Sequence, residues 1–338
     1  MKMIKVEDAV GCVLSHDVTQ IIPGEFKGRL FKKGHIIREE DIEKLLSIGK
    51  ENVYVWEPKA GELHENDAAI RIKDLCIGQG VTISEEIKEG KIEFFAEIDG
   101  VLRVNKKKLF ELNSLGEIIV STLHNNTPIK KGEKIGATRV IPLIIDEEKI
   151  KIAEKLIEEK IIWVDEIKVK KCLLITTGNE VYKGRIKDAF LPVIESKLGY
   201  YGNEIIRQVI LPDEKERITE EIKKGIEENV DLIICTGGMS VDPDDVTPTA
   251  IKECGGDLVT YGSPVLPGAM FLLAYYNDIT ILGVPSCAMY SKRTVLDLVL
   301  PRVLADEKLT VDDIASYGHG GLCLDCKVCS FPHCSFGK

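Results

Sequence analysis

The pattern of hydrophobic and polar positions changes character near residue 170. Beyond it, short continuous apolar runs alternate with segments whose apolar residues recur every three or four positions. Residues 172–176 and 231–235 are continuous runs, which are typical of strands buried on both faces of a parallel sheet. Ile218 and Ile222 belong to the other pattern and would lie along one face of a helix. The second half of the chain therefore predicts alternating strands and helices.

We expect this half to form a three-layer α/β/α domain, in which helices cover both faces of a parallel sheet. Ligands of such sheets bind at the carboxyl ends of the strands. One helix is expected to begin at Asp213, where Glu216 would complete an acidic capping box. The expected strands cover residues 172–176, 204–210, 231–235, 270–276 and 279–284, and the other expected helices cover 188–198, 248–254 and 286–303.

The first half of the chain has a different pattern. Short β segments surround amphipathic helices expected at residues 38–46 and 146–160. Asp99-Gly100 is a favourable two-residue turn and predicts a hairpin between residues 91–98 and 101–104. We expect a smaller β-rich α+β region that consists of one or two units. The predicted domains are residues 1–165, the α/β domain at 166–310 and a cysteine-rich tail at 311–338.

Composition narrows the class of protein. The 338 residues are 44% hydrophobic and 30% charged, which is ordinary for a globular chain. A net charge of −10 gives no reason to expect a nucleic-acid partner. No apolar run approaches the roughly 20 residues that span a bilayer, and Glu7 and Asp8 stand where a signal peptide would be apolar. We expect a cytoplasmic protein without a membrane partner.

A glycine turn follows the strand at 231–235. Gly237 and Gly238 would let the backbone approach a ligand closely, and their N–H groups could hold an anion. The sequence Thr-Gly-Gly also occurs in turns that do no more than leave a strand, so this alternative stays open. The next helix would start with Thr247 as its cap and Pro248 at its first position.

Three acids follow this turn. Asp242, Asp244 and Asp245 would repel a bare phosphate, whereas a divalent cation such as Mg²⁺ could bridge carboxylate and phosphate oxygens. The alternative is a solvated acidic turn with one aspartate capping the next helix. Since residues 176–188 leave the same sheet edge, Glu180 and Asp188 could converge on these acids. Asp188 is also a natural cap for its own helix.

Four short motifs in the second half of the chain resemble those of a known family. They are Thr176-Thr177-Gly178-Asn179-Glu180, Thr236-Gly237-Gly238, Asp245-Val246-Thr247-Pro248 and Pro267-Gly268. With them, residues 170–304 resemble the molybdopterin-binding domain shared by the molybdopterin adenylyltransferase and molybdopterin molybdotransferase families.

The resemblance implies a protein of molybdenum cofactor biosynthesis. It would bind molybdopterin or its adenylated form and carry out Mg²⁺-dependent molybdate insertion as a transferase, with a molybdoenzyme client as a further partner. Asp245 and Glu180 would be the catalytic residues, with Asp245 also placing Mg²⁺. The resemblance places the ligand at Thr177, Gly178, Thr236, Gly237, Gly238, Ser240, Pro267 and Gly268.

Two other functions remain open. The chain could be a non-catalytic carrier or sensor of the cofactor, since residues 284–288 read Val-Pro-Ser-Cys-Ala where molybdotransferases usually carry Leu-Pro-Gly-Asn-Pro. It could also process nucleotides, because Asp244-Asp245 is similar to the competence-damage-inducible family. The oligomeric state is equally open, a homo-oligomer included.

The cysteines are unevenly distributed. Six of the ten lie singly among apolar residues, and the other four fall within the last sixteen residues, separated by two, two and four residues. Such spacing favours a metal site, and it resembles iron–sulfur spacing more than zinc spacing. Zinc as Cys₄, or as Cys₃His with His319 or His333, is the competing assignment. A short tail with few large apolar residues could need its metal for order. The four expected ligands are Cys323, Cys326, Cys329 and Cys334.

Overall fold

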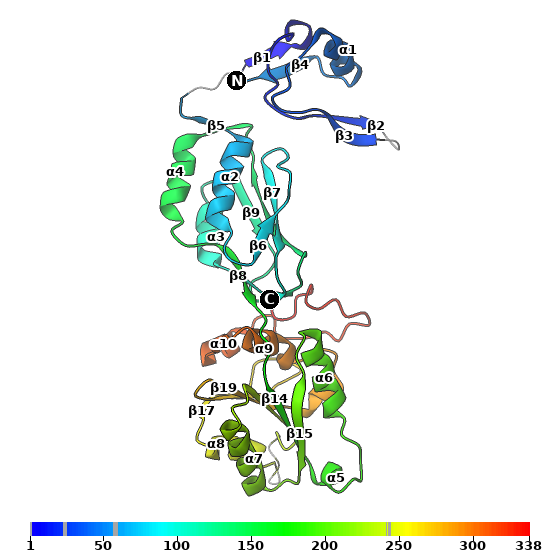
Figure 1. The fold of residues 1–338 in the computed structure, drawn as a ribbon, viewed down its shortest axis with the longest axis vertical. Helices are drawn as coiled ribbons and strands as arrows, with labels where there is room; N and C mark the ends of the chain where they lie inside the picture. The colour runs from blue at the N-terminus through cyan, green and yellow to red at the C-terminus, as the bar shows by residue number, and fades with distance from the viewer. Residues whose placement is uncertain (1, 23–25, 57–59, 241, 243–244) are drawn as a thin grey trace. The chain divides into compact units, whose positions relative to one another are not determined.

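The computed structural model describes residues 2–22, 26–56, 60–240, 242 and 245–338 (Figure 1). Contacts divide the chain into two compact units. Unit 1 comprises Met1–Ile98, Leu102–Asn125 and Ile129–Val164, and unit 2 comprises Asp99–Val101, Asn126–Pro128 and Asp165–Lys338.

Unit 1 contains two separate hydrophobic cores. The first is small and includes the fully buried Val6, Leu14 and Leu45. Around it, β1 pairs antiparallel with β4, and β2 pairs antiparallel with β3. These elements are β1 (Lys2–Lys5), η1 (Val6–Asp8), β2 (Val18–Ile22), β3 (Phe26–Phe31), α1 (Glu39–Ser47) and β4 (Asn52–Val55).

The second core lies between a four-stranded sheet of order β6-β7-β11-β9 and the helices that cover it. Phe94 and Ile135 from the sheet and Ile72 and Ile150 from the helices are fully buried there. The elements are β5 (Glu62–His64), α2 (Glu65–Cys76), β6 (Val81–Ile83), β7 (Lys91–Ala96), α3 (Lys106–Asn113), β9 (Ile118–Thr122), β11 (Lys134–Val140), β12 (Ile144–Asp146) and α4 (Glu147–Leu156).

The hairpin expected around Asp99-Gly100 does not form. Strand β7 pairs with β6 and β11, whereas β8 (Gly100–Val104) lies between β10 (Pro128–Ile129) and β13 (Ile162–Glu166). The burial patterns give the reason. Every second residue of β7 is buried, whereas all five residues of β8 are buried. Strand β8 is therefore the central strand of a separate three-stranded sheet.

Unit 2 has the expected α/β fold. Its six-stranded sheet has the order β15-β14-β16-β19-β18-β17. The first four strands run parallel, and β18 and β17 are antiparallel additions at one edge, so the sheet is mixed. The strands are β14 (Cys172–Thr177), β15 (Ile205–Leu211), β16 (Leu232–Thr236), β17 (Asp257–Tyr261), β18 (Leu272–Tyr276) and β19 (Ile279–Val284).

Helices cover both faces of this sheet (Figure 1). Alternate residues of β14 point to opposite sides, so Leu174 packs with α6 and α9 while Leu173 packs with α7 and α8. The helices are α5 (Asn179–Tyr182), α6 (Phe190–Tyr200), α7 (Lys215–Glu227), α8 (Thr247–Glu253), η2 (Ser286–Met289), α9 (Val295–Leu304) and α10 (Val311–Ser316).

Two details of the expected helices are wrong. Helix α7 has Glu214 as its N-cap, with no side-chain cap. Asp213 instead accepts a hydrogen bond from the backbone N–H of Asn179 at 2.9 Å, so its carboxylate serves α5. The single helix expected over 286–303 is two elements, because a new capping box at Thr294 restarts the helix as α9.

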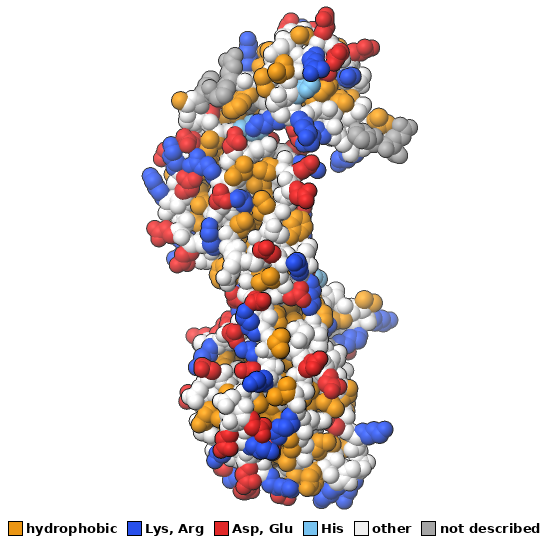
Figure 2. Space-filling model, in the orientation of Figure 1, with side chains coloured by type: hydrophobic (Ala, Val, Ile, Leu, Met, Phe, Trp, Pro, Cys, Tyr) orange, Lys and Arg blue, Asp and Glu red, His pale blue; other side chains and the backbone are white. Residues whose placement is uncertain are grey.

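The surface carries charges of both signs. Figure 2 shows acidic and basic side chains interspersed over the face in view. In the described part of the chain, none of the helices has the length and apolar character required to cross a bilayer.

Candidate functional site

The carboxyl ends of β14 and β16 lie side by side, because the two strands pair in parallel with Thr176 opposite Thr236. Both threonines are fully buried, and their hydroxyl oxygens are 3.4 Å apart. The chain after each strand therefore emerges at one point of the sheet edge, and the loops at Thr177 and Gly237 begin next to each other.

The glycine turn is tightly constrained by β14. Gly237 and Gly238 have φ of +85° and +54°, the left-handed region that glycine adopts readily. A Cβ on Gly237 would lie 2.1 Å from the backbone oxygen of Thr177, and one on Gly238 would lie 2.7 Å from Oγ1 of Thr247. Side chains are excluded at both positions, while the glycines themselves are half-exposed. Backbone that carries no side chain thus lies at the surface beside the end of β14.

Thr247 has a different role from the one expected. It is the first residue of α8, and Val246 is the N-cap. Its buried hydroxyl lies 3.2 Å from the hydroxyl of Thr177. This contact ties the start of α8 to the end of β14 beneath the glycine turn. Pro248 is the second residue of the helix, one place later than expected.

The acidic segment after the turn is anchored at both ends. Asp245 is half-buried, and its backbone N–H donates to the carbonyl of the exposed Asp242 at 2.9 Å. Tyr261 donates its hydroxyl to the carbonyls of Met239 (3.0 Å) and Ser240 (3.2 Å). Burial and then the negative charge of Asp245 raise the pKa of Tyr261, so this carboxylate lies near the anchored loop. Asp244 lies outside the described residues.

The loop after β14 contributes Gly178 and Glu180. Gly178 is the N-cap of α5 with φ +145°. Glu180 is exposed, and its carboxylate oxygen Oε2 would lie 4.0 Å from a Cβ on Gly178. Asp188 is engaged elsewhere: it accepts hydrogen bonds from Gln208 at 2.6 Å and from the N–H of Phe190 at 2.8 Å. Asp188 is not the N-cap of α6, which is Ala189, but from the position before it Asp188 accepts the N–H of the first helical residue.

Pro267 and Gly268 pack on helix α9. A Cβ on Gly268 would lie 2.6 Å from Cγ1 of Val295, and the N–H of Val295 donates to the carbonyl of Pro267 at 3.2 Å. The segment before them pairs with the C-terminal tail, through a bridge between Leu266 and Leu322. Pro267 and Gly268 thus contact α9, whereas the tail contacts the preceding residue, Leu266.

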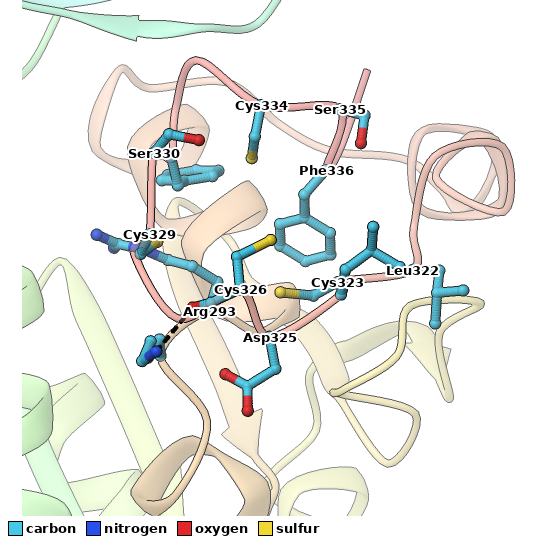
Figure 3. Close-up of a pocket in the computed structure, with 13 residues that line it drawn as sticks. Arg293, Leu322, Cys323, Asp325, Cys326, Cys329, Ser330, Cys334, Ser335 and Phe336 are labelled. Carbon is cyan, nitrogen blue, oxygen red and sulfur yellow. Dashed lines mark hydrogen bonds between the residues drawn. The ribbon is translucent and has the colours of Figure 1, made fainter.

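The four tail cysteines line one cavity of about 50 Å³, which we call the tail cavity (Figure 3). Cys326 and Cys329 are exposed, and Cys323 and Cys334 are half-buried. Figure 3 shows the sulfur atoms of Cys323, Cys326 and Cys334 directed toward a common space. Among the described residues, no group of three or more His, Cys, Asp or Glu side chains is placed to hold a metal ion.

A second and larger cavity, of about 540 Å³, lies between α6 and the segment that follows η2. Lys197 and Asp297 line it and form a buried ion pair at 2.7 Å, and Arg293 donates to the same carboxylate at 2.8 Å. Lys292 and Arg293 line both this cavity and the tail cavity. We call it the α6 cavity.

The cysteines inside the sheet are enclosed in apolar surroundings. Cys172 and Cys235 are fully buried. Burial raises the pKa of the Cys172 thiol to about 12 and raises that of Cys235 as well. Burial likewise raises the pKa of Cys287, the half-buried cysteine after β19. None of these three thiols is in an environment that favours the thiolate.

The structure thus brings Thr177, Gly178, Thr236, Gly237 and Gly238 together at one sheet edge. Two side chains that support this edge, Tyr261 and Thr247, could not be identified from the sequence. Tyr261 sits on β17, a strand that was not expected, and Thr247 looked like a helix cap. Both side chains contact residues distant in the sequence, so no local spacing of residue types indicates their role.

These features define a class: a three-layer α/β domain with a side-chain-free amide turn at the carboxyl edge of its sheet. Comparison with known families is more specific. Residues 173–305 match the model of the probable molybdopterin binding domain, which confirms for this part of the chain the resemblance expected from the sequence. Residues 3–57 match a domain of unknown function.

Individual relatives match a shorter region. A protein of Pyrobaculum calidifontis is 38% identical over 83 residues, which is 25% of this chain and 31% of that protein. A CinA-like protein of Thermosipho melanesiensis is 36% identical over 92 residues, 27% of this chain and 23% of that protein. The match thus spans less than a third of the length of either relative.

Two solved structures are also similar to part of this chain at low identity. The molybdopterin biosynthesis enzyme MoaB of Thermus thermophilus is 18% identical with a TM-score of 0.34, and the match covers 41% of this chain and 98% of that one. The protein CinA of Thermoplasma acidophilum is 20% identical with a TM-score of 0.32, and the match covers 36% of this chain and 90% of that one.

Proposed function

We propose that unit 2 binds molybdopterin or its adenylated form at the glycine turn and catalyses Mg²⁺-dependent insertion of molybdate. The observation that carries this proposal is the turn itself, where Gly237 and Gly238 are half-exposed beside the end of β14 and leave no room for a Cβ. The family match over residues 173–305 supports a pterin as the ligand.

The amides would receive the phosphate end of the ligand. Backbone N–H groups at a positive-φ turn form a concave anion site, and the hydroxyl of Ser240 is exposed on the same loop. Thr177 and Thr236 support the turn from below, because both are buried.

The carboxylates explain why a cation is part of the proposal. Asp245 flanks the turn and would oppose a phosphate there by like-charge repulsion. Mg²⁺ is usually held by one or two carboxylates together with substrate phosphate oxygens, so one flanking carboxylate fits the needs of this ion. Bound Mg²⁺ would neutralise phosphate charge. Asp245 would hold the ion, and Glu180, beside Gly178, would orient the molybdate that is the second substrate.

The proposal predicts release of AMP when purified protein is incubated with adenylated molybdopterin, Mg²⁺ and molybdate. Asp245→Asn should slow this release by about tenfold or more, which corresponds to about 1.4 kcal/mol of lost transition-state stabilisation. Pterin binding, followed by the ligand's fluorescence, should weaken less than the rate falls, because the amides of the turn remain in place.

Asp278→Asn is the matched control. Asp278 is exposed in the turn between β18 and β19, at the amino end of β19 and so at the opposite edge of the sheet. AMP release that is equal in both variants would contradict the role of Asp245. Tight pterin binding without AMP release would instead indicate a carrier or sensor.

A second candidate function follows from the CinA-like relative. The same amide turn could hold the phosphate of a pyridine nucleotide, which would make the chain a nucleotide-processing enzyme. Pyridine nucleotides should then be converted by the purified protein, and Gly237→Ala should abolish that turnover. Competition between pterin and nucleotide for one site separates the two candidates by their relative affinities.

A further inference from the structure

We propose that Cys323, Cys326, Cys329 and Cys334 bind an iron–sulfur cluster in the tail cavity. This site is distinct from the glycine turn and does not depend on the proposed function. The inference rests on three observations: four cysteines line one cavity, with three of their sulfur atoms directed toward a common space; the segment at each cysteine is held to the body of unit 2; and two cations line the same cavity.

Cys323 is fixed by backbone pairing. Its N–H donates to the carbonyl of Leu266 at 2.8 Å, and the N–H of Leu266 donates to the carbonyl of Gly321 at 2.8 Å. Gly321 itself permits this approach, since a Cβ there would lie 2.3 Å from the carbonyl oxygen of Tyr317. The first cysteine therefore enters the cavity from a strand-like segment held against the domain.

Cys326 is fixed by a lysine from the domain. Nζ of Lys292 donates to the carbonyls of Cys326 at 2.8 Å and of Lys327 at 3.1 Å. These bonds hold a peptide segment that has no helix or strand of its own. Groups that orient metal ligands from outside commonly act in this way.

The last two cysteines are held by aromatic packing. Phe331 follows Cys329 and lies under the guanidinium of Arg293 at 4.8 Å. Phe336 follows Cys334 and is 3% exposed, packed into the core that α9 shares with the sheet. Gly337 fits against Leu298, where a Cβ would lie 2.4 Å from Cδ2. Much of the tail is exposed, and these contacts nevertheless fix its path around the cavity.

The charge around the cavity suits an anionic group. A cluster with four thiolate ligands carries net negative charge, and Lys292 and Arg293 line the cavity with one acid, Asp325. The positive charges of Lys292 and Arg293 would therefore attract an anionic group to this cavity.

The space favours a cluster over a single ion. Four thiolates around zinc lie about 2.3 Å from one point and leave no room between them. Here the four cysteines share the lining of a space of about 50 Å³ with apolar residues such as Leu322 and Phe336, and no three of the described His, Cys, Asp or Glu side chains are placed to hold one metal ion. An iron–sulfur cluster distributes its four cysteines over several iron atoms, so the four sulfur atoms need not meet at one point. The spacing of the first three cysteines agrees with this assignment.

The test is metal and sulfide analysis of the full chain after anaerobic purification. We expect iron and acid-labile sulfide in matching amounts, a broad absorbance band near roughly 400 nm that reduction bleaches, and little zinc. If the chain is isolated without metal, reconstitution with ferrous iron and sulfide under anaerobic conditions should give the same spectrum.

Two substitutions make the test specific. Cys326→Ser should lose bound iron at least about tenfold, and its far-ultraviolet circular dichroism should be unchanged because Cys326 is exposed. Cys12→Ser, at a half-buried cysteine of unit 1, is the matched control and should keep its iron. Lys292→Met, which removes the contacts to the Cys326 segment, should weaken iron retention by about tenfold.

Stoichiometric zinc without sulfide would overturn the cluster assignment. A chain that holds no metal even after reconstitution, or iron that survives Cys326→Ser, would overturn the site as a whole. None of these results depends on pterin binding, so failure here is distinguishable from failure of the proposed function.

Discussion

Gly237 is the single position on which the glycine turn depends most. Its φ of +85° strains any other residue, and a Cβ would come 2.1 Å from the carbonyl oxygen of Thr177. Neither atom can move without shifting the end of β14. The residue is thus constrained by backbone geometry and by packing at once, whether or not a ligand is bound.

Gly237→Ala should therefore destabilise unit 2 by about 2–4 kcal/mol and abolish pterin binding. Urea unfolding and ligand titration measure the two effects. Gly202→Ala is the control, because Gly202 has a φ of +71° and a Cβ added there would meet no atom within 4 Å. Backbone strain alone should then destabilise unit 2 by about 1–2 kcal/mol. Equal losses in both variants would show that the contact with Thr177 is unimportant.

At the scale of single residues, the sequence predicted the glycine turn and its buried strands well. Continuous apolar runs and a Gly-Gly pair are features of neighbouring residues, and they predict local structure without knowledge of distant contacts. The contact of Thr247 with Thr177 and the hydrogen bonds of Tyr261 join segments far apart in the chain. No spacing rule could have indicated them.

At the scale of elements, buried charge distinguishes helix α2. Glu65 begins this helix and is 7% exposed. Burial, followed by the charge of Glu89, raises the pKa of Glu65 to about 7, although Arg139 and Lys33 oppose the shift. The folded chain therefore retains this proton at pH values where the unfolded chain, with a pKa near 4.5, has released it.

The stability of unit 1 should consequently fall as pH rises from about 4.5 to about 7. Glu65→Gln keeps the shape of the protonated side chain and should be more stable than the natural chain at pH 8, by on the order of 1–3 kcal/mol. At pH 4 the two should unfold alike. Urea unfolding at both pH values measures the difference, and an advantage that persists at pH 4 would contradict this account.

Helix α2 also shows why some elements were not expected. Its buried face includes Ala68 and Ala69, and such small residues give a weak hydrophobic periodicity. Strand β17 was missed because its residues are exposed or half-buried at the sheet edge. The strongly apolar strands β14 and β16 were predicted to within one or two residues. Helices and strands were thus predicted correctly where strongly apolar residues form a clear pattern, and were missed where the apolar pattern is weak.

At the scale of the whole molecule, the two units have separate cores, and the match to the probable molybdopterin binding domain lies within unit 2. Binding to a folded unit stabilises that unit by mass action. Adenylated molybdopterin at about 100 times its dissociation constant should stabilise unit 2 by about 2.7 kcal/mol.

Unit 1 supplies the internal control for this prediction. Hydrogen exchange should slow in β14 and β16 when the ligand is added, while exchange in β7 and β11 of unit 1 remains unchanged. Uniform protection of both units would indicate that the ligand is not confined to the glycine turn.

Lys292 and Arg293 stand in the wall that the tail cavity shares with the α6 cavity. Two occupants that draw on the same pair of positive charges are energetically coupled, and the coupling must be reciprocal. An anion in the α6 cavity would weaken binding of the cluster that we propose at the cysteines, and loss of that cluster would strengthen binding of the anion by the same factor. Lys292 and Arg293 would thereby make anion binding beside helix α6 depend on whether the proposed cluster is present.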